Sequence, residues 1–169
     1  QREKFVTAAV NPDVLVMTAT PIPRTLTLTL YGDLDVSVID ELPANRGEII
    51  TALRSPNNMK KIIAFMRSEL AAGRQIYIVS PLIEESEKSD RSAAVSEWEK
   101  WTGIFPGEPI GLLHGRLSPD EKDAVMADFR NNTTHILIAT TVVEVGVDVP
   151  NATIMLINDA DTFGLSQLH

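Results

Sequence analysis

The sequence contains no cysteine, few aromatic residues and no long apolar run. Without cysteine, disulfide bonds and cysteine-ligated metal sites are excluded, and the chain has the composition expected of a cytoplasmic protein. His114, His135 and His169 are too scattered to suggest a metal site. No run reaches the roughly 18 apolar residues of a membrane span, and the polar start at Gln1–Lys4 does not predict a signal peptide. We therefore expect neither a bound metal nor a membrane partner.

Positive charge is also scarce, because 15 lysines and arginines stand against 23 aspartates and glutamates, a net charge of −8. Nucleic-acid binding needs local positive potential, so this balance argues against it when taken alone. Much of the acid lies between Glu84 and Glu99, where it could form a solvated face remote from any nucleic acid. The charge therefore lowers the expectation of a nucleic-acid partner without excluding it.

Short, uninterrupted apolar runs alternate with segments of helical spacing. Runs without polar interruption are typical of strands buried on both faces, as in a parallel sheet. Strand–helix alternation of this kind predicts an α/β fold with helices on both faces of the sheet. The predicted strands are Val14–Met17, Ile76–Val79, Ile110–Leu113, Ile136–Ala139 and Ile154–Ile157.

Two helices carry end signals. Apolar residues from Met59 to Leu70 follow helical spacing, and Gly73 is placed to end that helix. Ser118 is a good N-cap, with Pro119 in the first turn and Glu121 positioned to complete a capping box.

The segment from Asp33 to Gly47 has little periodicity and several turn residues, so we interpret it as an interdomain linker. It divides the chain into residues 1–47, too short for a domain, and residues 48–169, which hold at least four predicted strands. Ser86–Arg91 is expected to form a loop before a helix that holds Trp98 and Trp101. The two tryptophans could stack on unpaired bases or pack in the core.

Polar residues follow several of the predicted strands. Hydroxyls at the carboxyl end of a parallel strand lie where α/β sheets bind ligands, and Thr18 and Thr20 are placed in this way after the first strand. Thr140 and Thr141 follow a later strand, where threonine hydroxyls can hold a phosphate of a nucleic-acid backbone. Ser80 ends another strand, and contact with a nucleic acid and capping of a turn are equal alternatives for it.

The loop after Thr141 brings a glycine and a carboxylate close together. Gly146 permits close backbone approach to a ligand, and Asp148 can accept hydrogen bonds from ribose hydroxyls. A solvated turn before Pro150 is the alternative for Asp148. His114 and Arg116 lie in a further strand-to-helix turn, with Lys122 on the helix that follows.

Whole strings of this sequence resemble the motifs of superfamily 2 DNA helicases. Thr18–Leu26 resembles motif III, Val79–Glu87 motif IV and Ile138–Asn151 motif V. Leu30–Pro43 is similar to the RecG family in particular, and Phe163–His169 resembles the approach to motif VI. The resemblance covers the whole chain, and it implies a RecA-like fold of the P-loop NTPase type.

The resemblance also implies roles for residues. Four residues of motif III would couple bound ATP to movement on DNA, namely Thr18, Ala19, Thr20 and Arg24. Gly146 and Asp148 would face the nucleotide, with Glu144 less certain. The residues expected near the nucleic acid are Thr140, Thr141, Arg116, His114 and Ser80, and the position of Lys122 fits either a contact or a solvated residue.

By this resemblance, the chain is the end of a first helicase lobe (1–47) and most of a second (48–169) in a bacterial, cytoplasmic enzyme. The parent would hydrolyse ATP with Mg²⁺ and remodel branched double-stranded DNA during recombination and repair. No Gly-x-x-x-x-Gly-Lys-Ser/Thr string occurs, so we expect no catalytic residue in this chain and no ATP hydrolysis by it alone. The alternatives are a non-catalytic domain that binds DNA or protein, and an unrelated nucleotide-binding enzyme, which the absence of a glycine-rich dinucleotide fingerprint disfavours.

Overall fold

The structure is a computed structural model that describes residues 37–39, 47–81, 89–140, 149–164 and 168. The chain divides into two units, residues 1–49 with residue 169, and residues 50–168. In the first unit, residues 37–39 and 47–49 have no regular secondary structure. The predicted strand at 14–17 and most of the predicted linker lie outside the described residues, so the boundary between 47 and 48 stays a prediction.

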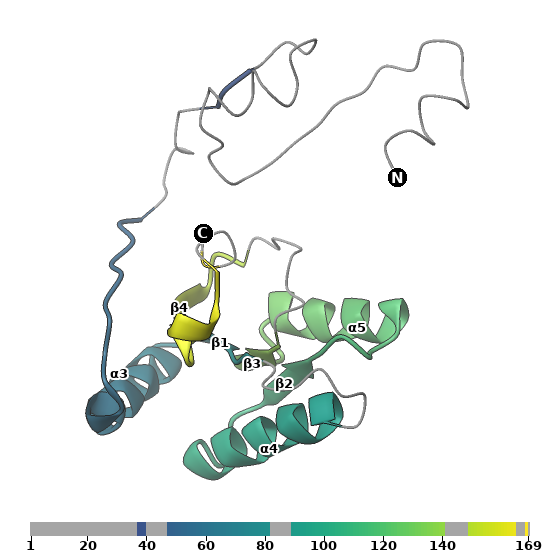
Figure 1. Cartoon of the computed structure of the whole chain (residues 1–169), viewed down its shortest axis with the longest axis horizontal. Helices are drawn as coiled ribbons and strands as arrows, with labels where there is room; N and C mark the ends of the chain where they lie inside the picture. The colour runs from purple at the N-terminus through teal and green to yellow at the C-terminus, as the bar shows by residue number, and fades with distance from the viewer. Residues whose placement is uncertain (1–36, 40–46, 82–88, 141–148, 165–167, 169) are drawn as a thin grey trace. The chain divides into compact units, whose positions relative to one another are not determined.

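Among the residues that the structure describes, four strands form one parallel sheet in the second unit (Figure 1). They occur where the sequence has continuous apolar runs, which confirms the predicted α/β class. The strands are β1 (Gln75–Val79), β2 (Ile110–Leu113), β3 (Ile136–Ala139) and β4 (Ala152–Ile157). Their spatial order is β2-β3-β1-β4, and the two central strands are the most buried.

Three α-helices and two short 3₁₀ helices also occur within the described residues. They are α3 (Met59–Ala71), α4 (Ser89–Ile104), α5 (Pro119–Arg130), η1 (Pro56–Asn58) and η2 (Ala160–Thr162). The predicted loop at 86–91 is wrong in its second half, because α4 already begins at Ser89. Serine and aspartate are common in loops, but they are equally favoured at the start of a helix, and the sequence pattern did not separate these cases.

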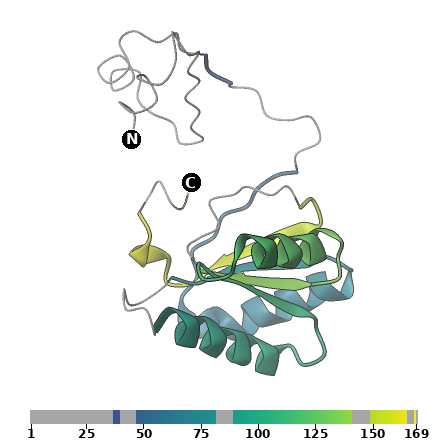
Figure 2. The same cartoon turned by 90° about the vertical axis from the view of Figure 1, so that its right-hand side faces the viewer.

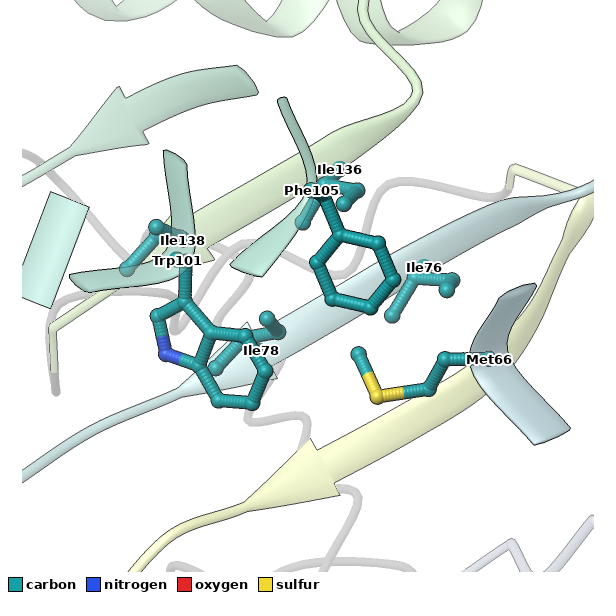
Figure 3. Packing of buried hydrophobic residues seen from close by; sticks show 7 residues of the cluster. All are labelled: Met66, Ile76, Ile78, Trp101, Phe105, Ile136 and Ile138. Carbon is teal, nitrogen blue, oxygen red and sulfur yellow. The ribbon is translucent and has the colours of Figure 1, made fainter. Parts of the chain in front are cut away.

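The two faces of the sheet are covered by different helices (Figure 2). Side chains alternate along a strand, so Ile76 and Ile78 face α3 and α4, whereas Tyr77 faces α5. Figure 3 shows the core on the first face, where Trp101 and Phe105 of α4 meet the isoleucines. Their rings are stacked with centroids 6.1 Å apart. The seven buried residues of this core are Met66, Ile76, Ile78, Trp101, Phe105, Ile136 and Ile138.

Gly73 ends α3 as predicted. It lies just past the C-cap with a φ of 76°, a left-handed conformation that glycine adopts without steric cost. Its N–H donates to the Leu70 carbonyl at 2.9 Å, and the Arg74 N–H donates to the Glu69 carbonyl at 3.0 Å. These two bonds form a Schellman motif, so the turn delivers the chain directly into β1.

The predicted capping box of α5 is present, and it yields a stability prediction. Ser118 Oγ accepts from the Glu121 N–H at 3.3 Å, and the Glu121 carboxylate accepts from the Ser118 N–H at 2.7 Å.

Ser118→Ala should lower the free energy of unfolding by about 1 kcal/mol, measured by urea denaturation. The backbone and side-chain hydrogen bonds from Ser118 lower the pKa of Glu121. The carboxylate therefore stabilises the fold above its unfolded-state pKa, and this contribution disappears as the pH falls through the lower folded-state pKa.

The difference in the free energy of unfolding between wild type and Ser118→Ala should shrink in acid, because the mutation removes the hydrogen bond that Ser118 Oγ donates to the Glu121 carboxylate at 2.9 Å. The bond from the Ser118 N–H is present in both proteins. A difference that stays constant down to strongly acidic pH would contradict the role of the Ser118 Oγ–Glu121 carboxylate bond.

Candidate nucleic-acid interface

The first residue after each strand is polar, and the register of the sheet brings these four residues into one row. Val79 is paired with both Ala139 and Ile157, and Leu113 is paired with Ala139. Because all strands are parallel, the residues that follow these pairs share the carboxyl edge of the sheet. We call them the strand-end row, which consists in spatial order of His114, Thr140, Ser80 and Asn158.

Backbone hydrogen bonds extend the sheet into this row. The Ser80 N–H donates to the Ala139 carbonyl at 3.0 Å, and the Thr140 N–H donates to the Leu113 carbonyl at 3.1 Å. The Asn158 N–H donates to the Val79 carbonyl at 2.8 Å. The sheet therefore fixes the positions of three polar residues that come from separate parts of the sequence.

Side chains alternate between the two faces of the sheet along each strand, and this places the strand-end row on the face that α4 covers. Ser80 lies two residues after Ile78, and Thr140 lies two residues after Ile138, and both isoleucines belong to the core against α4. Asn158 stands in the same relation to Leu156, which packs against that core. Polar groups from α4 can therefore reach the strand ends.

A pocket of about 300 Å³ opens at this place. Ser80, Thr140 and Asn158 line it from the strand ends, and Glu97 and Lys100 line it from α4. His114 is not among the lining residues, although it belongs to the row. The remaining lining residues are Met59, Pro81, Ala94, Ser96, Ile138 and Asp159.

The Thr140 hydroxyl differs from the other polar groups of the pocket. Thr140 is 3% exposed, and its Oγ1 has no hydrogen-bond partner among the described residues. Ser80 Oγ, in contrast, accepts from the Asn158 side-chain amide at 3.0 Å. A buried hydroxyl without a partner costs about 1–3 kcal/mol, so a ligand oxygen that accepts from Thr140 would recover this cost.

The turn between β2 and α5 is held by its own hydrogen bonds. The Arg116 N–H donates to His114 Nδ1 at 3.3 Å, and the Leu117 N–H donates to the His114 carbonyl at 3.3 Å. Lys122 Nζ donates to the Gly115 carbonyl at 3.1 Å, so this lysine fastens the turn to α5. The Arg116 side chain is exposed and has no hydrogen bond or ion pair to any part of the chain that the structure describes.

Comparison with known proteins identifies the domain. Residues 54–169 match the family described as helicase conserved C-terminal domain. The chain belongs to this family. Together with the parallel sheet, the match confirms the predicted RecA-like fold of a helicase lobe.

The chain is similar over its whole length to proteins named ATP-dependent DNA helicase RecG. It is 55% identical to the Bacillus subtilis protein and 48% identical to the Thermotoga maritima protein, and it is covered completely in both comparisons. It spans only 25% and 22% of those proteins, respectively. The predicted resemblance to a segment of RecG is thereby confirmed, and these relatives are enzymes by name.

One solved structure, the Mycobacterium smegmatis helicase Lhr bound to ssDNA and AMP-PNP, is 17% identical. The match covers 60% of this chain and 13% of the Lhr chain, with a TM-score of 0.37.

Asn158 and Glu97 are among the polar residues of the pocket that were not predicted from the sequence. Asn158 follows an apolar run just as Ser80 and Thr140 do, so the rule that selected those two would also have found it. Glu97 lies in the acidic segment that was interpreted as a solvated face, and for this residue the interpretation is wrong. Its side chain is only 28% exposed, and it accepts a hydrogen bond from Trp101 Nε1 at 3.0 Å.

The two tryptophans of the helicase domain have different environments. Trp101 is 0% exposed and belongs to the core, which confirms the packing alternative for it. Trp98 is 37% exposed, and its Nε1 donates to the Ile110 carbonyl at 3.1 Å. This bond ties α4 to the start of β2.

Many predicted site residues lie outside the described residues. They are Thr18, Ala19, Thr20 and Arg24 of the motif III string, and Thr141, Glu144, Gly146 and Asp148 of the motif V string. Within the described residues, no group of three or more metal-ligating side chains occurs. No helix in that part of the chain is long and apolar enough to cross a membrane.

Proposed function

We propose that the chain acts as the second lobe of an ATP-dependent DNA helicase, and that the carboxyl edge of its sheet contacts the DNA backbone. The family match and the names of the RecG relatives support the helicase assignment. The observation that carries the DNA contact is the buried Thr140 hydroxyl, which lines the pocket without a partner among the described residues. A phosphate oxygen is an acceptor that fits it.

Two cations support this site. Lys100 lines the pocket with a side chain that is 49% exposed, and its positive charge offsets that of Glu97, whose Oε1 lies 2.8 Å from Lys100 Nζ. Arg116 lies two residues beyond His114 of the strand-end row, and its guanidinium is available to a second phosphate. The net negative charge of the chain does not oppose this proposal, because DNA binding depends on the local electrostatic potential.

The wider activity is proposed from the resemblance. ATP would bind between this lobe and a first lobe of the same polypeptide, with Gly146, Asp148 and Glu144 facing it from this side. Mg²⁺ would be held by residues outside this chain, and closure of the two lobes would alter the grip on DNA. The substrate would be branched DNA such as forks and four-way junctions, remodelled during repair in the bacterial cytoplasm.

The test compares ATP hydrolysis by this chain and by a full-length helicase that carries it, each with and without a synthetic four-way junction. We expect hydrolysis only by the full-length protein, stimulated by the junction, because this chain lacks a phosphate-binding loop string. Turnover by the chain alone that Asp148→Ala abolishes would contradict the division of roles. A full-length protein that does not respond to any DNA would favour a non-catalytic binding domain instead.

A further inference from the structure

Glu97 is the centre of a hydrogen-bond network in the pocket. Its Oε2 accepts from Trp101 Nε1 at 3.0 Å, from Ser80 Oγ at 3.3 Å and from Asn158 Nδ2 at 3.4 Å. Its Oε1 accepts from Lys100 Nζ at 2.8 Å. Donors from α4 and from the residues that follow β1 and β4 therefore converge on one carboxylate, in a place where we propose that an anionic backbone binds.

The network determines which hydroxyl is free to donate. Ser80 Oγ has one proton, which it donates to Glu97, and it also accepts from Asn158 Nδ2 at 3.0 Å. It has no second proton for a phosphate oxygen. Thr140 lies on the neighbouring strand at the same level, and its hydroxyl makes no such bond within the described residues.

We propose that Glu97 is a positioning residue, which holds Ser80 and Asn158 in the network and leaves Thr140 as the hydroxyl that donates to a DNA phosphate. This inference rests on the proposed function of the pocket. The negative charge of Glu97 also limits how tightly the pocket holds a phosphate. Weaker binding suits a lobe that must release and rebind DNA in each cycle. Ser80 then influences DNA binding through its hydrogen bond to Glu97 and not by direct contact with DNA.

Glu97→Gln in the full-length helicase tests the proposal. Glutamine keeps the shape and an acceptor oxygen for Ser80 Oγ and Trp101 Nε1, but it removes the charge. A neutral amide oxygen accepts more weakly than a carboxylate, so the Ser80 hydroxyl is held less firmly and its proton can turn to a phosphate oxygen. We expect DNA to bind about 3- to 10-fold more tightly, measured as the Kd for a fluorescent four-way junction at fixed salt. A purely structural role for Glu97 would weaken binding or leave it unchanged.

A double-mutant cycle assigns the effect to Ser80. Ser80→Ala alone should change the Kd much less than Thr140→Val does, because the Ser80 proton is already donated to Glu97. In the Glu97→Gln background, Ser80→Ala should abolish the tighter binding. Glu99→Gln is the matched control, since it removes the same charge from an exposed position of α4 and should leave the Kd within about twofold of wild type.

The possible outcomes separate the two proposals. If Thr140→Val weakens DNA binding but Glu97→Gln does not tighten it, the positioning role is overturned and the DNA site stands. The same conclusion follows if Ser80→Ala alone weakens binding as much as Thr140→Val. If Thr140→Val has no effect on binding, the proposed DNA contact of the pocket fails, and the positioning role fails with it.

Discussion

Thr140→Val is expected to make the protein more stable and less active. Valine has nearly the shape of threonine, but it lacks the buried hydroxyl that has no partner among the described residues. Removing an unsatisfied buried hydroxyl should raise the free energy of unfolding by about 1–2 kcal/mol. The loss of a hydrogen bond to a charged phosphate should cost about 1.5–3 kcal/mol, which corresponds to roughly 10- to 100-fold weaker DNA binding. The measurements are urea denaturation, and junction-stimulated ATP hydrolysis by the full-length helicase.

The opposite signs of these two effects identify the hydroxyl as a functional group. Tyr77→Phe is the matched control, because the Tyr77 hydroxyl is also buried without a partner among the described residues. Tyr77 faces α5 on the opposite side of the sheet and does not line the pocket. Burial raises the pKa of Tyr77 to about 12, since the phenolate would be poorly solvated there. Tyr77→Phe should therefore stabilise the fold without lowering ATP hydrolysis.

Thr140→Ser completes the comparison. Serine retains the hydroxyl, so junction-stimulated hydrolysis should stay within a few fold of wild type, although the lost methyl group costs about 1 kcal/mol of stability. If the serine and valine variants lose activity equally, the hydroxyl of Thr140 is not the group that contacts DNA.

The sequence predicted those parts of the fold that depend on local patterns. Ile76–Val79 and Ile136–Ala139 are continuous apolar runs, and both are strands in the centre of the sheet. Ser118 and Glu121 stand three residues apart in a capping box, which is a purely local arrangement. The resemblance to helicase motifs then added the family, which the comparisons confirm.

The pocket could be predicted only in part, because its geometry depends on the order of the strands. β1 lies between β3 and β4, so Ser80 is adjacent to Thr140 and Asn158, although 60 and 78 positions separate them in the sequence. Strand order is not encoded in any single run of residues. Glu97 was missed for a related reason, since a glutamate in an acidic helix has no local feature that reveals a partner on a distant strand.

Gln75 shows the same limitation, and replacing it is expected to have the largest effect on stability. The predicted strand began at Ile76, but β1 begins at Gln75, which is 0% exposed. Its Nε2 donates to the Phe129 carbonyl at 2.5 Å and to the Thr134 carbonyl at 2.7 Å. Asn151 Nδ2 donates to its Oε1 at 3.2 Å. One side chain thus joins β1 to the end of α5 and to the segments before β3 and β4.

Gln75→Leu keeps a similar volume but removes every one of these bonds. The Phe129 carbonyl retains the Asn132 N–H as a donor at 3.2 Å, so the larger loss falls on the Thr134 carbonyl. We expect the free energy of unfolding to fall by about 2–4 kcal/mol, because the Thr134 carbonyl is left unpaired and the Phe129 carbonyl and the Asn151 amide each lose a hydrogen bond. Urea denaturation measures this difference. A loss below about 1 kcal/mol would show that water replaces the amide at this place.

Gln75→Glu separates the hydrogen-bond donor from the shape of the side chain. A carboxylate would direct negative charge at two carbonyl oxygens in a buried place, so this variant should be less stable than Gln75→Leu at neutral pH. Burial and the facing carbonyls would raise the folded-state pKa of the new carboxyl group above its unfolded-state value. The folded protein would then bind the extra proton, and stability would decrease as the pH rises above the unfolded-state pKa. Below that pKa the protonated acid can donate to one carbonyl, so the stability of Gln75→Glu relative to wild type should increase in acid, whereas the deficit of Gln75→Leu should not depend on pH.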